Sequence, residues 1–346
     1  MSAEPDPRTD PTRPGAPSPD ETSPDETSPD VTSLDPTEPA GSAPATLARV
    51  VRTLDELYPP STAEDWDAVG LVAGDPGARV RKVLLAVDPV EEVADEALAW
   101  GADLLVTHHP LFLRPVHSVA ATTFKGSLVH RLIRGGCALY VAHTNADAAE
   151  RGVADALADA LDLLHRVPLV PHAPSSPHEP PRTGTGRVGR LAEPTTLRAF
   201  AERVAQVLPP TVQGVRVAGD LDARVESVAV VGGSGDSLFD AVRASGADVY
   251  LTSDLRHHPV SELRERARLD GGEAGTPFLV DVPHYASEWP WLRYAAEDLV
   301  RVLARSGAAV ETRVSTLVTD PWTARFPSAP ADPAADAGPP RDTAQG

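Results

Sequence analysis

The sequence Gly101-Ala-Asp-Leu-Leu-Val-Thr-His-His-Pro110 decides how the rest of the chain is interpreted. Its apolar run, Leu104-Leu-Val106, is typical of a strand buried on both faces of a parallel sheet, and it ends directly in two histidines. Upstream, Val83-Leu-Leu-Ala-Val87 predicts another buried strand. Asp88-Pro89 then predicts the start of a helix, with Asp88 as its cap and the proline at its first position. The whole stretch therefore predicts a β-α-β unit.

The same pattern returns later in the chain. Gly246-Ala-Asp matches Gly101-Ala-Asp at an offset of 145 residues, and the strand that begins at Val228 lies at the same offset from Val83. Each copy finishes in a His-His-Pro triplet, at 108–110 and at 257–259. These coincidences predict an internal duplication. Because strands alternate with helices, we expect an α/β fold of two similar lobes with parallel sheet, and any ligand site at the carboxyl ends of the strands between them.

The ends of the chain differ in composition from its body. Residues 1–44 contain eleven of the 36 prolines and ten acidic but only two basic side chains, which predicts a disordered acidic tail. Residues 327–346 are interpreted in the same way. Pro168 to Gly189 is rich in proline and glycine and predicts an exposed connector. The expected organisation is a first lobe at 45–165, a linker at 166–189, a second lobe at 190–277 and a C-terminal segment at 278–326 that completes the metal site and sheet.

Charge and composition exclude several classes of protein. The net charge is −19, and an acidic surface does not attract phosphate backbones, so nucleic acid is not the expected partner. The single cysteine, Cys137, lies in an apolar run and is expected to be a buried thiol. No apolar stretch approaches the ~20 residues that span a bilayer, and the N-terminus lacks the plan of a signal peptide. We therefore expect a cytoplasmic protein without membrane contact.

Potential metal ligands follow three apolar strands. Leu104-Leu-Val106 leads into His108 and His109, Leu139-Tyr-Val141 into His143 and Asp147, and Phe278-Leu-Val280 into Asp281 and His284. If these strands share one sheet, their carboxyl ends place imidazoles and carboxylates along one edge, a donor set that suits zinc, iron, manganese or nickel. His284 and Glu288 are four residues apart, which puts both on one face of a helix that begins near His284.

Several of these residues have a second interpretation. Asp147 could instead cap a helix through Val153 and Leu157. His143 could be a ligand, a donor that orients Asp147, or a hydrogen-bonded histidine at a strand end. In the second copy, Arg256, His257 and His258 are either polar loop residues or catalytic candidates that hold an anionic group or carry a proton. Gly232-Gly-Ser-Gly235 is either a plain turn or a phosphate cradle.

Seven motifs, in this order, resemble the dinuclear metal-centre hexameric proteins, the Nif3-like family known as GTP cyclohydrolase 1 type 2 homologues. The resemblance covers roughly Leu47 to Trp322. The motifs are Trp66-Asp-Ala-Val-Gly-Leu71, Thr107-His-His-Pro110, His143-Thr-Asn-Ala-Asp147, Gly186-Arg-Val-Gly189, Gly232-Gly-Ser-Gly235, Thr252-Ser-Asp254 with His257-His258, and His284-Tyr-Ala-Ser-Glu288. Ala68 stands where the family usually has an amide, and Pro283 stands where a glycine commonly precedes the late histidine.

The resemblance implies a site, an assembly and an activity. The two divalent metal ions would be bound by His108, His109, Asp147, His284 and Glu288, and the chain would assemble as a homohexamer. The expected function is a metal-dependent hydrolase that acts on a small anionic or nucleotide-like substrate, such as GTP, through metal-activated water. The alternatives are a metal-dependent phosphoesterase and a non-catalytic metal-binding hexameric scaffold.

Overall fold

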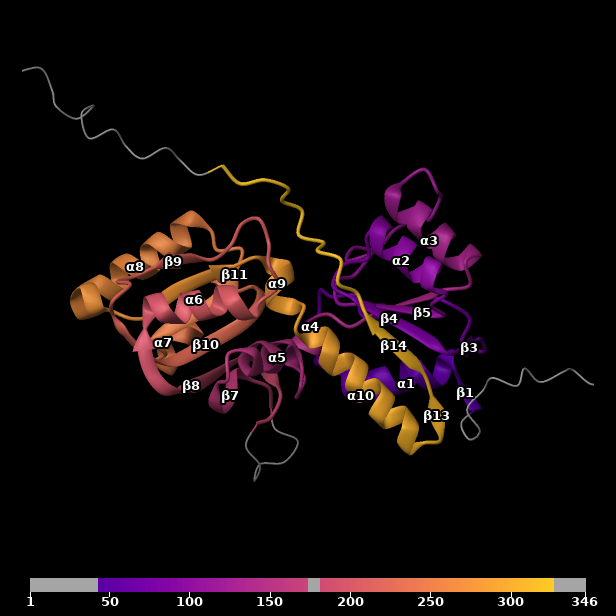
Figure 1. Cartoon of the computed structure of the whole chain (residues 1–346), viewed down its shortest axis with the longest axis horizontal. Coiled ribbons are helices and arrows are strands. Elements are labelled where there is room, and N and C mark those ends of the chain that lie inside the picture. Colours follow the sequence, from indigo (N-terminus) through magenta and orange to yellow (C-terminus); the bar gives the residue numbers. More distant parts are fainter. Residues whose placement is uncertain (1–42, 174–180, 327–346) are drawn as a thin grey trace, which may run out of the picture. The chain divides into compact units, whose positions relative to one another are not determined.

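The computed structural model describes residues 43–173 and 181–326 (Figure 1). It confirms the expected α/β class: helices pack on three sheets. The predicted tails at 1–44 and 327–346 lie almost wholly outside the described residues. No helix within those ranges is long and apolar enough to cross a membrane.

The first sheet has five strands in the order β14-β4-β5-β6-β2. Its centre is parallel and is formed by β4 (Lys82–Ala86), β5 (Leu104–Thr107) and β6 (Ala138–Val141). The C-terminal strand β14 (Glu311–Val314) adds to β4 in parallel, and β2 (Gly70–Ala73) pairs antiparallel with β6. In Figure 1 the yellow β14 lies beside the indigo β4, so the first sheet contains both an early and a late part of the chain.

Alternation along these strands divides their side chains between two faces. Leu84, Leu105 and Leu139 pack with α2 (Glu91–Trp100) and α3 (Phe124–Arg134). Their neighbours on the opposite face pack with α1 (Leu47–Leu57) and α10 (Trp291–Arg305), as expected for a parallel sheet covered on both sides. Cys137 lies in the first of these two layers, and burial raises the pKa of its thiol to about 12, which confirms the expected buried thiol.

The second sheet has six strands in the order β7-β8-β10-β11-β12-β9. Its parallel centre is β10 (Arg224–Ser234), β11 (Val249–Ser253) and β12 (Phe278–Val282). The antiparallel strands around it are β7 (Leu164–Pro171), β8 (Gly184–Thr196) and β9 (Arg216–Ala218). One face packs on α5 (Val153–Ala160) and α6 (Leu197–Val207), and the other on α7 (Phe239–Ser245) and α8 (His257–Gly271).

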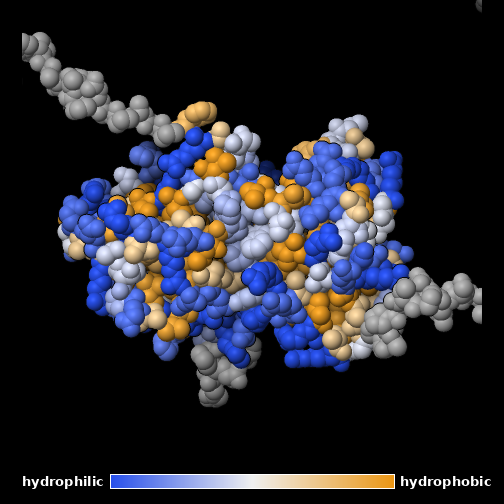
Figure 2. Space-filling view, in the orientation of Figure 1, coloured by the Kyte–Doolittle hydropathy of each residue, from blue (hydrophilic) through white to orange (hydrophobic). Residues whose placement is uncertain are grey.

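Short elements complete the structure. A third sheet, β13-β1-β3, joins β1 (Ala43–Thr46) to β3 (Arg79–Val80) and β13 (Ala308–Ala309). The short helices are α4 (Thr144–Ala148), α9 (His284–Glu288) and the turns of 3-10 helix at Pro60–Thr62, Asp236–Leu238 and Gly272–Ala274. Hydrophilic side chains cover most of the face seen in Figure 2.

One hydrophobic core is common to both large sheets. It contains Leu85 and Val106 from the first sheet, Val230 and Val280 from the second, and the fully buried Trp291 of α10. Because the strands of both sheets pack against the same buried cluster, their carboxyl ends are held by shared packing rather than by loops alone.

The structure differs from the sequence-based expectations at several points. Residues 166–189, expected to be an exposed connector, contain most of β7 and the start of β8, which pair with each other in the second sheet; only 174–180 lie outside the described residues. Helix α2 begins at Glu91 rather than at Asp88-Pro89, and Val90 occupies its cap position. A parallel β-α-β unit occurs at each copy of the repeated pattern, but a duplication as its origin stays a prediction.

Arg187 of β8 predicts a strong effect on stability. Its guanidinium is buried, pairs with Asp155 through Nε and Nη2 at 2.9 Å each, and donates to the carbonyls of Gly184, Gly186 and Ala149. Arg187→Met leaves the Asp155 carboxylate unpaired, and we expect the free energy of unfolding to fall by roughly 3–5 kcal/mol. The control is Arg190→Met on the same strand, where an exposed pair with Glu226 is lost and the expected change is below about 1 kcal/mol. Urea denaturation of both variants measures the difference; equal losses would contradict it.

Candidate metal centre

The five predicted metal ligands lie together. His108 and His109 follow β5, Asp147 belongs to α4 after β6, and His284 and Glu288 are the first and last residues of α9 after β12. The three strands do not share one sheet, because β12 belongs to the second sheet. The cluster is therefore formed by the strand ends of two sheets. Pro283 takes the cap position of α9, and His284 still faces the other ligands.

Glu288 occupies the centre of the cluster and is only 2 % exposed. Its Oε1 lies 3.3 Å from His108 Nε2 and 3.0 Å from His284 Nε2, and its Oε2 lies 3.1 Å from His109 Nε2. The Nε2 atoms of His109 and His284 are 3.2 Å apart. Asp147 is slightly farther away, with its Oδ1 at 3.7 Å from His108 Nε2. All five side chains thus direct ligand atoms to one place.

The other ring nitrogen of each histidine already has a partner. His108 Nδ1 donates to the carbonyl of Ala142 at 2.9 Å, because a carbonyl can only accept. His109 Nδ1 lies 2.7 Å from Asp88 Oδ1, and His284 Nδ1 lies 2.7 Å from Asp254 Oδ2. These partners favour the proton on Nδ1 and leave each Nε2 as a lone pair, which is the arrangement of histidines that bind metal.

The facing lone pairs repel one another unless a cation lies between them. In this tautomer, the Nε2 atoms of His109 and His284 face each other without a hydrogen between them, and both face the Glu288 carboxylate. Among the described residues, His108 Nε2, Asp147 Oδ1 and Glu288 Oε2 are buried atoms without a hydrogen bond. Such atoms are costly to bury unless a ligand pairs with them. The residues therefore fit divalent metal ions.

The charges in the cluster are strongly coupled. Burial alone would raise the pKa of Glu288, but His109, His108 and His284 outweigh it and hold that pKa well below its usual range. Burial and the Glu288 charge together raise the pKa of Asp147 to about 7. Burial lowers the pKa of His284, yet the charge of Glu288 and the bond to Asp254 raise it to about 10, and the pKa of His109 is raised in the same way. Glu288 thus requires positive charge, which protons or metal cations can supply.

His143 lies beside the cluster, and its ring nitrogens belong with those of His108 and His109 to one possible donor group. Its Nδ1 lies 2.9 Å from Asp67 Oδ1, and Asp67 also accepts from the backbone and hydroxyl of Thr144. Burial opposes ionisation of Asp67, but the bonds from His143 and Thr144 outweigh it and lower its pKa. Asp67 thus anchors the start of α4, and His143 is held by Asp67 rather than by Asp147.

Other candidate residues have different places. Asp147 does not cap a helix, because it lies inside α4, and Gly152 occupies the cap position of α5. Arg256 pairs with Asp236, and His257 lines a separate pocket in the second lobe. Neither of these residues, nor His258, lines the two cavities beside the cluster. Their catalytic role stays a prediction that the geometry does not favour.

Two cavities adjoin the cluster. The larger, of about 540 Å³, is lined by Asp147, Glu288, His284, His143 and the glycine motif at 232–234. The smaller, of about 290 Å³, lies beside His109 and His284 and is lined by Asp88 and Asp254. Part of the glycine motif is occupied internally, because the Gly233 amide donates to Ser287 Oγ at 2.9 Å.

Sequence patterns do not identify the carboxylates that orient the histidines. Asp88-Pro89 predicts a helix cap, and Asp254 and Asp67 lie in motifs that assign them no role at the site. Asp88 follows β4 closely, and Asp254 follows β11 directly. Like the predicted ligands, they therefore lie at the carboxyl ends of parallel strands. The requirement that a ligating histidine have an Nδ1 acceptor, applied to these strand ends, could have found both.

The fold and the donor set define an α/β protein with a buried site of imidazoles and carboxylates that could hold metal ions. The chain belongs to the Duf34/NIF3 (NGG1p interacting factor 3) family, whose model matches residues 45–321. The family resemblance stated from the motifs is thereby confirmed.

Individual relatives agree with this assignment. A Streptomyces coelicolor protein named GTP cyclohydrolase 1 type 2 homolog is 55% identical over 284 residues, which cover 82% of this chain and 96% of that protein. A Mycobacterium tuberculosis protein of the same name is 37% identical, with 80% of this chain and 96% of that protein covered. The crystal structure of a Bacillus cereus protein related to NIF3 has a TM-score of 0.73 at 26% identity and covers 82% of this chain and 100% of that one.

Gly233 provides a test of the cluster's tight packing. A Cβ at this position would lie 2.7 Å from Glu288 Oε1 and 3.2 Å from His284 Nε2. We therefore expect Gly233→Ala to weaken metal binding by about tenfold or more, the size of effect typical when the residues that orient metal ligands are changed. Gly246→Ala is the control, because Gly246 has a similar φ (71° against 69°) but open space around its Cβ. Both variants should lose roughly 1–2 kcal/mol of stability from positive φ. Zinc titration that shows equal metal affinity in the two variants would contradict the expectation.

Proposed function

We propose that this chain is a metal-dependent hydrolase of the GTP cyclohydrolase 1 type 2 kind, which holds two divalent cations and acts on a small nucleotide-like substrate. The observation that carries the proposal is the group of buried donor atoms without hydrogen bonds, supported by three histidines whose Nδ1 atoms are already committed.

The distances between the donor atoms divide the ligands into two overlapping sets. His108 Nε2 faces Asp147 and Glu288, and His109 Nε2 faces His284 and Glu288. Glu288 is common to both sets, and its Oε1 is near both His108 and His284, so this carboxylate would be shared by the two cations. When bound, such cations supply the Lewis acidity that makes a water nucleophilic near neutral pH and that polarises a substrate oxygen. Zinc, iron, manganese and nickel all accept this mixture of ligands.

The other residues of the site would orient the donors and the substrate. Asp88 and Asp254 hold His109 and His284 in one tautomer, and Asp67 holds His143. Because His143 Nδ1 is bound to a carboxylate, its Nε2 is the atom at which this side chain can take or give a proton in the larger cavity. We propose this role for His143 in preference to Arg256, His257 and His258.

The larger cavity determines what kind of substrate is suitable. Its volume of about 540 Å³ is within the usual range for small-molecule sites, and the half-exposed Trp66 offers an aromatic face at its rim. No arginine or lysine is among its described lining residues. The phosphates of a nucleotide would therefore depend on the cations for charge compensation, and binding of GTP should be lost on chelation.

The test is elemental analysis and activity on the same sample. We expect protein purified without added metal to carry close to two metal ions per chain and to hydrolyse GTP or a member of a phosphoester panel. Asp147→Ala combined with Glu288→Ala should lose both metal and turnover, because it removes one ligand from the first set and the shared ligand from both. Glu297→Gln is the control, since its carboxylate on α10 is exposed and, within the described residues, pairs with Arg151 alone.

The outcomes separate the alternatives. Turnover of GTP supports the cyclohydrolase activity, and turnover of phosphoesters alone replaces it with the phosphoesterase. Metal without turnover in either assay favours the non-catalytic scaffold. Absence of metal after reconstitution with zinc, iron, manganese and nickel would overturn the proposal.

Assembly as a homohexamer in the cytoplasm, which the resemblance implies, is part of the same proposal. Light scattering coupled to size-exclusion chromatography should give six times the chain mass of 36.4 kDa. A monomer or dimer mass at micromolar concentration would contradict it.

A further inference from the structure

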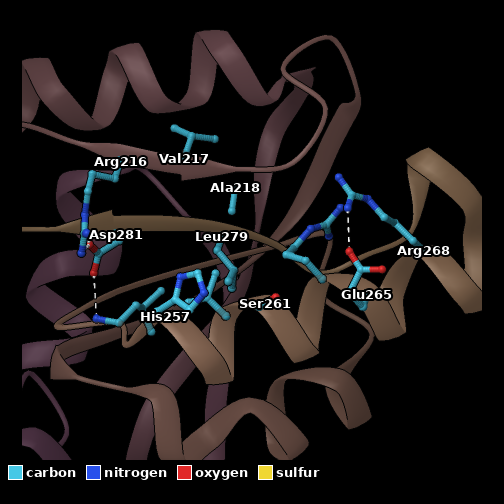
Figure 3. Close-up of a pocket in the computed structure, with 12 residues that line it drawn as sticks. Arg216, Val217, Ala218, His257, Ser261, Glu265, Arg268, Leu279 and Asp281 are labelled. Atoms are coloured by element: carbon cyan, nitrogen blue, oxygen red, sulfur yellow. Dashed lines mark hydrogen bonds and ion pairs between the residues drawn. The ribbon is translucent and has the colours of Figure 1, made fainter. Parts of the chain in front are cut away.

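Another pocket lies in the second lobe, away from the predicted metal ligands. It has a volume of about 410 Å³ and is bounded by the edge strand β9, by β12 and by helix α8 (Figure 3). None of the five predicted ligands and none of the carboxylates that orient them lines it. The proposed hydrolase activity therefore assigns no role to this pocket.

The middle of this pocket is apolar and its two ends are charged. In Figure 3 Val217, Ala218 and Leu279 lie between Arg216 with Asp281 on one side and Arg268 with Glu265 on the other. Val260 and Leu255 add further apolar surface, and Ser261 and His257 come from α8. Such a lining, mostly apolar with a few placed polar groups, is typical of small-molecule sites of ~300–1,000 Å³.

Arg264 is the distinctive residue of the pocket, since it is only 6 % exposed but has no carboxylate partner among the described residues. Its Nη1 donates to the carbonyls of Gly275 and Pro277 at 2.8 and 2.6 Å, and its guanidinium lies over the Phe278 ring. No described residue accepts from its Nε or Nη2. Burial, and then the neighbouring charge of Arg268, lower its pKa, while the charge of Glu273 raises it. A buried guanidinium without a hydrogen-bonded carboxylate is costly and favours an anion.

The remaining charges of the pocket are mostly neutralised in pairs. Arg216 pairs with Asp281, and Arg268 Nη1 lies 2.8 Å from Glu265 Oε1. Asp281 also accepts from the Leu255 amide at 3.1 Å, so one of its oxygens is occupied by the backbone. Among the residues of the lining, the charge without a paired carboxylate is therefore that of Arg264. Arg268 beside it is a half-exposed cation that pairs with Glu265 and, at 3.9 Å from its Nε, with Glu273 Oε2, and a ligand in the pocket would compete with these two carboxylates for it.

We propose that this pocket binds a small organic anion, with its apolar body on Val217, Ala218 and Leu279 and its acidic group on Arg264 and Arg268. A carboxylate and a phosphate monoester share this chemistry, since both pair with the planar guanidinium. The site is separate from the proposed metal centre, and its occupation does not require metal.

The experiment is a ligand-observed NMR titration of the full chain with benzoate, phenyl phosphate and the neutral benzamide, before and after treatment with EDTA. We expect at least one of the two acids to bind, benzamide to bind much more weakly, and the binding to survive removal of metal. Whichever acid binds more tightly identifies the acidic group.

Matched variants locate the binding. Arg268→Ala should weaken the dissociation constant by about tenfold, the effect of losing one charge-assisted hydrogen bond. Arg266→Ala is the control, because it removes the same charge from the same helix but loses only the exposed pair with Asp270, outside the pocket. Ala218→Trp, which fills the apolar middle, should abolish binding while leaving metal content unchanged.

Three results would overturn the proposal: neither acid binds at millimolar concentration, benzamide binds as tightly as the acids, or Arg268→Ala and Arg266→Ala behave alike. Binding that disappears with EDTA would likewise assign the acids to the metal centre and not to this pocket. Metal content of each variant, measured in parallel, separates these results from a failure of the hydrolase proposal.

Discussion

The contact between His109 and His284 is the constraint on which the arrangement of the molecule depends. Their Nε2 atoms come within 3.2 Å although one histidine follows a strand of the first sheet and the other a strand of the second. Such an approach is stable only if the Nδ1 atom of each histidine is hydrogen-bonded and positive charge lies between the two Nε2 atoms and Glu288. Asp88 and Asp254 make these hydrogen bonds, and the hydrophobic core shared by both sheets brings the two strand ends together.

The predicted ligands could be found from the sequence, because the end of a buried strand is marked by the change from an apolar run to polar residues. The apolar run before His108 and the four-residue spacing of His284 and Glu288 indicated both the elements and the direction of the ligands. The sheet to which β12 belongs could not be predicted in this way, since an apolar run shows that a strand is buried but not which strand lies next to it. Asp88 shows a related limit: Asp-Pro before a helical pattern predicts a cap, but tertiary contact with His109 decides its role.

The second lobe places two chemically different sites on either side of one short segment. The Asp254 carboxylate holds His284 at the candidate metal centre, and the amide of the next residue, Leu255, donates to Asp281 in the apolar pocket. Asp254 itself has a φ of 55°, a conformation that L-residues adopt at some cost. The turn that connects β11 to α8 is thus held by both sites. Sequence patterns gave no sign of this connection, because it depends on a single backbone amide.

The position of β14 has a consequence for how the chain folds as it is made. The first sheet receives this strand, which pairs with β4, only after the whole second sheet has left the ribosome, and β1 similarly waits for β13. Until then one edge of β4 has open hydrogen-bonding groups, which can pair with other chains. Folding from the N-terminus is the usual order during synthesis, but here the N-terminal lobe cannot be completed first. A nascent chain stopped before residue 311 would therefore expose an unprotected sheet edge, and chaperones that shield such edges would be most needed at that stage.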